Sequence, residues 1–334
     1  MLSRKFTIGY VAAVSIAAAQ VPYTGDIEFY GLHKVPVEKV RKALGVKTGD
    51  PLPPSKGDLE ERLEQISDVV LARVEAVCCS GASAVLFVGI EEKGAPHFAL
   101  RSAPQGPMLL PDSIIGAYRD FLRAVESAAR RGSVNEDLTH GHSLLADPDA
   151  RALQEQFLSF AAANLPLLRD VLRNSSDDEH RAIAAAVLGY APDKNAVVND
   201  LEYAMQDPDE RVRVNAVRAL TAVAVLARKQ PDLQIRVAPT WFVEMLNSIY
   251  LSDRTRAATA LVSLTDKNAA DTLDQIRNRA LTSVVEMARW KSLEHALPAF
   301  ILAGRMAGLS EKEIHQYWSQ GNRSAVLDKL LRGR

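Results

Sequence analysis

Two histidines, His140 and His142, are the residues of this chain whose type and spacing most directly suggest chemistry. One glycine separates them, and in an extended segment this spacing places both imidazoles on one side, as a metal site requires. A metal also needs a third and a fourth ligand, and no cysteine or acidic cluster at ligand spacing lies nearby. We interpret both as histidines of a polar loop; a metal-dependent hydrolase is the less favoured alternative.

Other catalytic patterns are missing from the sequence. There is no Gly-x-Ser-x-Gly elbow and no glycine-rich phosphate loop, and the remaining histidines are scattered singly. Cys78 and Cys79 are adjacent, so in a strand they point to opposite faces. We interpret them as small apolar residues, with an intermolecular disulfide as the alternative in an oxidising compartment. We therefore predict a protein that is not an enzyme and that holds neither cofactor nor metal.

Composition narrows the class of partner. The chain has 334 residues, of which 47% are hydrophobic and 24% charged, and its formal net charge is -1. That length accommodates about two domains. A near-zero net charge provides no overall field to attract nucleic acid, and we predict none as a partner.

The N-terminus has the pattern of an export signal. Arg4 and Lys5 precede an apolar run from Phe6 to Ala19, in which Ala17 and Ala19 satisfy the rule for cleavage before Gln20. We predict a signal peptide over residues 1–19 and a periplasmic or secreted protein with no integral membrane span in the mature chain. The alternative is an uncleaved signal that anchors the chain to the inner membrane.

Residues 24–94 alternate between strand and helix patterns. Short alternating runs over 26–30, 72–79 and 84–90 predict strands, whereas apolar residues at helical spacing over 36–44 and 58–70 predict helices. The order β-α-α-β-β, with Gly31 ending the first strand and the closing run from Val88 to Glu92, resembles the POTRA domain. That resemblance implies an extracytoplasmic α+β module, found in factors for secretion, outer-membrane assembly and division.

The sheet of such a module has an exposed edge that can accept an added strand. If the run 72–79 is that edge, Val74 and Val77 are candidate partner-binding residues. The implied setting is a complex associated with the cell envelope.

The rest of the chain divides into a connector and a helical domain. Residues 95–111 carry four prolines and read as a mobile, protease-sensitive linker, followed by a helical connector over 112–144. Residues 145–334 read as helix after helix. The predicted fold class is therefore an α+β domain followed by an all-α solenoid.

A repeat supports the solenoid. An Arg, an Ala three residues later and a Leu seven residues later recur in three places, which indicates stacked helix pairs. The three copies are Arg181, Ala184 and Leu188; Arg213, Ala216 and Leu220; and Arg254, Ala257 and Leu261. The second copy, which begins Asp207-Pro208-Asp209, resembles the inner helix of a HEAT repeat. In that family Asp and Arg six apart form a ladder between repeats. Ser175 in the first copy and Ser248 in the third stand in place of Asp, which predicts an interrupted ladder at these copies.

Arginines on these helices admit two interpretations. One is a basic stripe on the concave face, formed by Arg211, Arg213, Arg218, Arg254 and Arg256. The other, which we favour for Arg213, is pairing with Asp207, Asp209 or Glu210 inside the fold. Arg211 and Arg218 are freer to face solvent and are candidate partner-binding residues. A protein or peptide partner held by a solenoid or by a sheet edge is the function these features predict.

Overall fold

The structure is a computed structural model that describes residues 22–80, 83–266 and 269–332. Its N-terminal domain has the predicted order β-α-α-β-β. The elements are β1 (Tyr23–Tyr30), α1 (Val37–Leu44), α2 (Lys56–Glu64), β2 (Val69–Ser80) and β3 (Ser83–Glu92). The predicted signal peptide lies outside the described residues, as do the side chains of Cys78 and Cys79.

The sheet of this domain is mixed, with strand order β1-β3-β2. β1 pairs with β3 in parallel and β2 pairs with β3 antiparallel, so β1 and β2 are the edges. Helices α1 and α2 cover one face, where Val40, Leu44, Leu59 and Leu63 are buried against the strands. Gly31 ends β1 in the left-handed region, where a Cβ would lie 2.1 Å from the Ile90 carbonyl oxygen.

The second helix is shorter than the sequence predicts. The pattern predicts helix through residue 70, but α2 ends at Glu64 and Val69 already begins β2. Asp68 has a φ of 74°, a conformation that no helix continues through. The apolar pair Val69 and Val70 therefore belongs to the strand.

Residues 112–332 are almost wholly helical. α4 is bent at Asn164, two residues before Pro166, which cannot donate to the helix. The helices are α3 (Asp112–Arg130), α4 (Pro148–Asn174), α5 (Asp178–Leu188), α6 (Asn195–Ala204), α7 (Glu210–Lys229), α8 (Thr240–Met245), α9 (Leu251–Leu264), α10 (Ala270–Arg279), α11 (Leu281–Arg289), α12 (Leu293–Met306), α13 (Glu311–Ser319) and α14 (Arg323–Arg332). A two-residue ladder of β4 (Glu136–Asp137) and β5 (Leu144–Leu145) follows α3.

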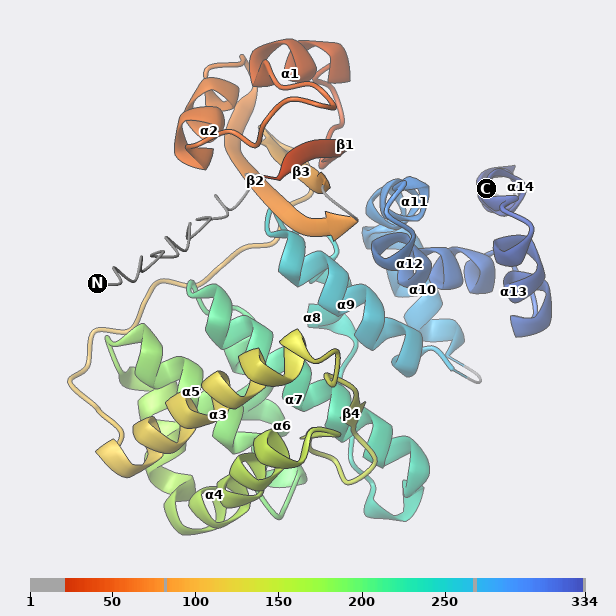
Figure 1. Ribbon diagram of the computed structural model, residues 1–334. Helices are drawn as coiled ribbons and strands as arrows, with labels where there is room; N and C mark the ends of the chain where they lie inside the picture. Colours follow the sequence, from red (N-terminus) through yellow and green to blue (C-terminus); the bar gives the residue numbers. More distant parts are fainter. Residues whose placement is uncertain (1–21, 81–82, 267–268, 333–334) are drawn as a thin grey trace, which may run out of the picture.

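These helices stack as a solenoid of two rows (Figure 1). In one row α5 packs on α7, α7 on α9 and α9 on α12; in the other, α6, α8 and α10 pack behind them. Aspartates cap the first helices of the row: Asp177 accepts from the His180 N–H, and Asp209 accepts from the N–H groups of Arg211 and Val212. The α+β domain and the helical solenoid of the predicted fold class are both present.

The second face of the sheet packs on the solenoid. Tyr30 of β1 and Phe87 of β3 are fully buried there, and their rings lie 5.9 and 5.0 Å from the ring of Trp290. The Tyr30 hydroxyl donates to the Ile249 carbonyl oxygen at 2.9 Å. Gly89 lets this tyrosine lie flat on the sheet, because a Cβ there would be 2.5 Å from its ring. The second face of the sheet therefore belongs to the core of the solenoid, while the face under α1 and α2 has a core of its own.

The connecting segment, residues 95–111, also lies against the solenoid. Arg101 N–H donates to the Gln206 carbonyl oxygen at 2.9 Å, and Gly106 N–H donates to that of Asn174 at 2.7 Å. Phe98 and Leu110 are buried. The prediction of a mobile linker is therefore wrong, because these anchors hold the backbone along the helices although its prolines prevent regular structure.

We expect trypsin to spare Arg101 in the folded protein and to cut it in a Gly106→Ala variant. A Cβ at Gly106 would lie 2.5 Å from the Asn174 carbonyl oxygen, so the segment must lift away. Cleavage should accelerate roughly tenfold, which corresponds to about 1.4 kcal/mol in the opening equilibrium. Gly116→Ala is the matched control, since its Cβ meets no described atom within 4 Å. Equal cleavage of both variants would contradict the anchoring role of Gly106.

Among the described residues, no helix is long and apolar enough to cross a membrane.

Candidate partner-binding site

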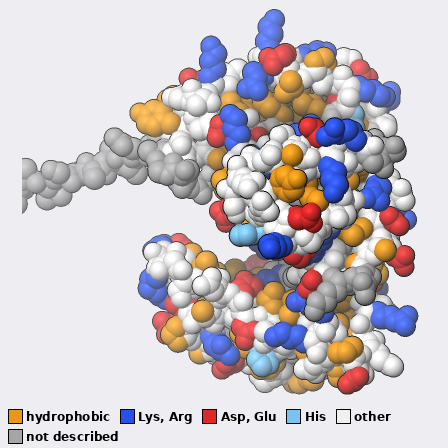
Figure 2. Space-filling view, turned by 90° about the vertical axis from the view of Figure 1, so that its right-hand side faces the viewer, with side chains coloured by type: hydrophobic (Ala, Val, Ile, Leu, Met, Phe, Trp, Pro, Cys, Tyr) orange, Lys and Arg blue, Asp and Glu red, His pale blue; other side chains and the backbone are white. Residues whose placement is uncertain are grey.

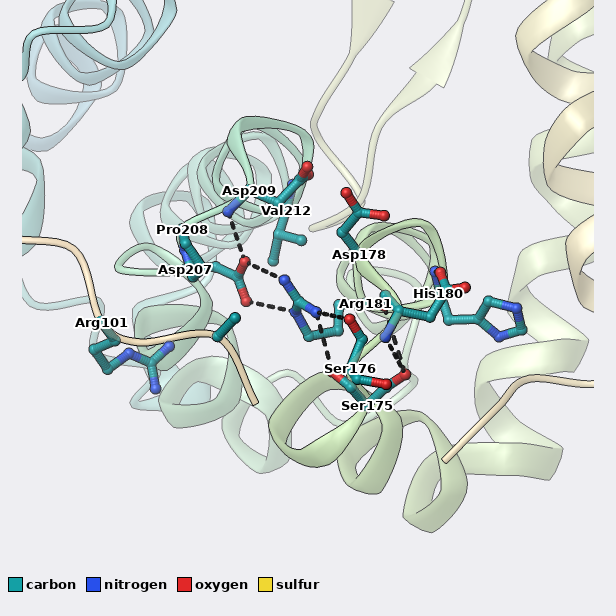
Figure 3. Close-up of polar contacts among 12 residues, drawn as sticks. Arg101, Ser175, Ser176, Asp178, His180, Arg181, Asp207, Pro208, Asp209 and Val212 are labelled. Atoms are coloured by element: carbon teal, nitrogen blue, oxygen red, sulfur yellow. Dashed lines mark hydrogen bonds and ion pairs between the residues drawn. The ribbon is translucent and has the colours of Figure 1, made fainter. Parts of the chain in front are cut away.

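A ladder of buried ion pairs holds the repeats together, and its first rung joins Arg181 of α5 to Asp207 (Figure 3). The guanidinium donates twice to the carboxylate, at 2.9 and 3.0 Å, and also to the carbonyl oxygens of Ser175 and Ser176. Both side chains are only 2% exposed. Such a bidentate pair fixes the distance and the angle between neighbouring helices.

The second rung corrects two predictions. Arg213 pairs with Asp253, whose two carboxylate oxygens both lie 3.0 Å from Nε, and not with Asp207, Asp209 or Glu210. The ladder is not interrupted before α9, because Asp253 takes the place of the missing acid. Ser248 donates its hydroxyl to the same Asp253 at 2.7 Å. Both charged side chains are fully buried. The acid has moved five residues along the chain, from the loop position into the first turn of α9.

The third rung extends into the N-terminal domain. Arg254 of α9 pairs with Glu286 of α11 at 3.2 Å, and its guanidinium lies 4.7 Å from the centre of the Tyr30 ring. Gly31 N–H donates to both carboxylate oxygens of Glu286 at 3.0 Å. Burial raises the pKa of this carboxyl group, and Arg254 opposes that effect. The third rung therefore joins α9 to α11 and, through Glu286, also holds the backbone that directly follows β1.

The small and apolar residues of the repeat lie between these helices. All six are fully buried in the solenoid core: Ala184, Leu188, Ala216, Leu220, Ala257 and Leu261. Arg211 is the contrast, with a side chain that is 57% exposed and that reaches Asp178 at 3.0 Å and Asp209 at 3.2 Å.

A groove of about 330 Å³ runs across the row of helices that contains α7, α9 and α12. In the space-filling view the molecule is hollowed on one side, between its upper and lower parts (Figure 2). The residues that line the groove come from α7, α9, α12 and the β4 turn: Val217, Arg218 and Thr221; Thr255, Arg256 and Thr259; Glu294, His295 and Pro298; Glu136 and Leu138. Three neighbouring helices thus offer one continuous surface that combines polar and apolar groups.

The threonines of the groove present acceptors to a ligand. Thr221, Thr255 and Thr259 each donate the hydroxyl proton to a carbonyl oxygen one turn earlier in their own helix, at 2.7 to 3.0 Å. Because the proton is used within the helix, the oxygen of each hydroxyl remains available as an acceptor. An extended backbone, which carries N–H donors at regular intervals, is the complementary chemistry.

The two arginines of the groove differ in their partners. Arg218 forms an ion pair with Glu136 at 2.8 Å and donates to the Ser143 hydroxyl at 3.0 Å, so it is not free to face solvent as the sequence suggested. Arg256 reaches solvent, yet within the described chain no hydrogen bond or ion pair engages its guanidinium. Burial in the groove lowers the pKa of Arg256, and the nearby Arg218 adds to that effect.

The histidine pair lies beside a small aromatic pocket, not in the groove. The rings of His140 and His142 are 6.1 Å apart, and His142 packs on Tyr190 at 5.3 Å. Asp137 approaches His140 at 3.7 Å. Across the described ranges, no three His, Cys, Asp or Glu side chains come together in an arrangement that could hold a metal.

His142 makes a pH dependence testable. Burial, with Lys194 nearby, lowers its pKa to about 4, whereas the unfolded chain binds that proton near pH 6.5. Unfolding therefore takes up a proton between these values, and stability should fall by about 1–3 kcal/mol as pH drops from 7 to 4. We expect His142→Gln to lose part of this dependence in urea titrations, and His97→Gln, at an exposed position, to retain it. Identical pH profiles for the two variants would contradict the assignment.

The predicted strand-addition edge is partly closed. Glu60 and Glu64 of α2 accept hydrogen bonds from the outward N–H groups of Val74, at 2.8 Å, and Ala72, at 3.0 Å. Val77 is paired with Val85 of β3 in the register of the sheet. Carboxylates that occupy edge donors in this way oppose pairing with a further strand.

The comparison with protein families agrees with the repeat. Residues 165–239 match the family of HEAT repeats. Among solved structures the chain is similar to "Designed armadillo repeat protein YIII(Dq)4CqI", with 15% identity and a TM-score of 0.32 over 58% of this chain and 98% of that chain. No curated protein matches the chain. The stacked helix pairs and the HEAT match define the class as a helical repeat solenoid, which typically serves as a scaffold for protein interactions.

Sequence reasoning missed most of the groove. It placed Arg256 on the right helix but gave it no role apart from the other arginines, and it overlooked the threonines and Glu136. The sequence does contain a signal for Arg256. It follows Asn215 by 41 residues, the same interval that separates Arg254 from Arg213, so the two residues are at equivalent positions of neighbouring repeats. No comparable sequence pattern predicts that the β4 turn lies beside α7 and α9 and lines the groove.

Proposed function

We propose that this chain is an exported interaction scaffold that holds an extended segment of a partner protein in the groove of α7, α9 and α12. The observation that carries the proposal is the groove itself, which crosses three stacked helices and is lined by threonine hydroxyls and by an arginine that no described residue engages. Solenoids use such concave surfaces for extended ligands because neighbouring repeats offer equivalent contacts at regular spacing.

An envelope role is part of this proposal. The N-terminal pattern of Arg4, Lys5 and Ala17-x-Ala19 supports export, and the β-α-α-β-β order supports the resemblance to POTRA domains of secretion, assembly and division factors. Intact-mass measurement of the exported protein should show loss of residues 1–19. A full-length cytoplasmic product would overturn export.

The sheet edges are less suited to partner capture than the groove. Glu60 and Glu64 occupy outward donors of β2, while the start of β1 bonds to the loop at Gly49 and Asp50. The open face of the sheet is already buried against Trp290. We therefore assign partner binding to the solenoid.

A photo-crosslinking amino acid at Thr259, which lines the groove, tests this function in the native extract. We expect discrete protein adducts from this position. The same group at Asn278, exposed on α10 in the other row, is the control and should not give them. No adduct at Thr259, or the same adducts from both positions, would overturn the assignment of the groove.

A further inference from the structure

The repeat register identifies a pair of equivalent positions on neighbouring helices. Arg213 and Arg254, the second and third arginines of the ladder, are 41 residues apart, and the same interval relates Asn215 of α7 to Arg256 of α9. Both residues therefore occupy the same place on their helix. The partners of Asn215 therefore indicate the direction in which the side chain of Arg256 extends.

Asn215 is already engaged by the chain itself. Its side-chain amide donates to the Tyr118 hydroxyl of α3 at 3.0 Å and to the Ala182 carbonyl oxygen at 2.9 Å. α3 lies across the front of α5 and α7 in Figure 1 and covers this part of the row. At Arg256, one repeat further on, none of the described residues takes the corresponding place.

The charges around Arg256 favour an anion. Its neighbour Arg218 repels it, while Glu136, an acid of the groove, is engaged by that same Arg218. Asp253 is bound to Arg213 inside the core, and Glu210 accepts from the Ser252 hydroxyl. On the far wall, Glu294 and the partly buried His295 face the groove from α12. A guanidinium remains charged at neutral pH, so a bound carboxylate relieves the cost of its partial desolvation.

We propose that the groove binds an acidic peptide segment, whose carboxylate side chain pairs with Arg256 while its backbone N–H groups donate to the threonine hydroxyls. This inference rests on the proposed function and specifies the chemistry of the partner. Three adjacent helices at spacings of about 8–10 Å span roughly 16–20 Å. At about 3.3 Å per residue, five or six residues in extended form fill that length.

Selection of a phage-displayed random library of 12-residue peptides tests the preference for acid. Peptides selected on the full chain should be enriched in Asp and Glu relative to the unselected library. Selection on the full chain carrying Arg256→Glu should lose that enrichment or favour Lys and Arg. Failure to select any peptide, or equal acidic enrichment on both proteins, would overturn the proposal.

Affinity measurements on the best selected peptide then locate the contact. We expect Arg256→Ala to weaken binding at least tenfold, about 1.4 kcal/mol, with an unchanged melting temperature. Arg236→Ala, at an exposed position on the loop between α7 and α8, is the matched control and should bind as the wild type does. Replacement of the peptide's acids by Gln or Asn should reproduce the loss on the wild type and cause no further loss on Arg256→Ala.

The two proposals fail separately. Groove crosslinks from Thr259 to partner segments without acidic residues would overturn the acidic ligand and leave the scaffold function standing. Absence of groove crosslinks would overturn the scaffold function, whatever the selected peptides contain.

Discussion

Replacement of Arg213 by Met should lower the free energy of unfolding by about 3–5 kcal/mol, because it leaves Asp253 as an uncompensated buried charge. Both side chains of this rung are fully buried, and the arginine also satisfies the carbonyl oxygens of Asp207 and Pro208. Urea denaturation followed by the helical circular dichroism signal measures the change. Because the rung joins α7 to α9, we expect both helices to lose protection together.

Arg211→Met is the matched control, two residues earlier on the same helix. Its side chain is 57% exposed, so the free energy of unfolding should change by no more than about 0.5 kcal/mol. The double variant Arg213→Met with Asp253→Leu should recover much of the loss, since it removes the stranded charge. A double variant as unstable as Arg213→Met alone would show that packing around the arginine, rather than the ion pair, stabilises the rung.

How much of this fold the sequence predicts depends on whether a feature is local. The N-terminal order is predictable because strand and helix patterns alternate over short runs, and the end of α2 was misplaced because the turn at Asp68 leaves no pattern. The repeats are predictable because Arg, Ala and Leu recur at a spacing that places all three on one face of a helix. The partner of Arg213 is not, since Asp253 lies 40 residues away and only the stacking of α9 on α7 brings it near.

The connecting segment shows how composition can mislead. Its prolines exclude helix and strand, which suggested a free linker, but an irregular backbone can still be anchored by hydrogen bonds to neighbouring helices. Phe98 and Leu110 were the available signals, because apolar residues in a mobile linker have no role, and both are buried. The groove is also only partly predictable. The repeat register gives the position of Arg256 on its helix, but that no described residue engages it depends on where α3 and the β4 turn lie in the fold.

Trp290→Ala should be the most damaging change at the junction of the two domains. The indole is 2% exposed and packs edge-on against Tyr30 of β1 and Phe87 of β3, so its removal leaves a cavity between sheet and solenoid. Such a truncation costs about 3–5 kcal/mol. Since the same surface carries the Arg254–Glu286 pair and its bond to Gly31, we expect the sheet to loosen from the solenoid.

Hydrogen exchange distinguishes this coupling from general destabilisation. In Trp290→Ala, the amides of β1 and β3 should exchange faster, together with those of α11. Trp318→Ala is the control, because that ring packs on Phe300 of α12 at 5.2 Å, away from the sheet. It should affect α12 and α13 and leave β1 and β3 protected. If β1 and β3 keep their protection in Trp290→Ala, the sheet is stable without its contact with the solenoid. The Arg254–Glu286 pair would then stabilise only the helices.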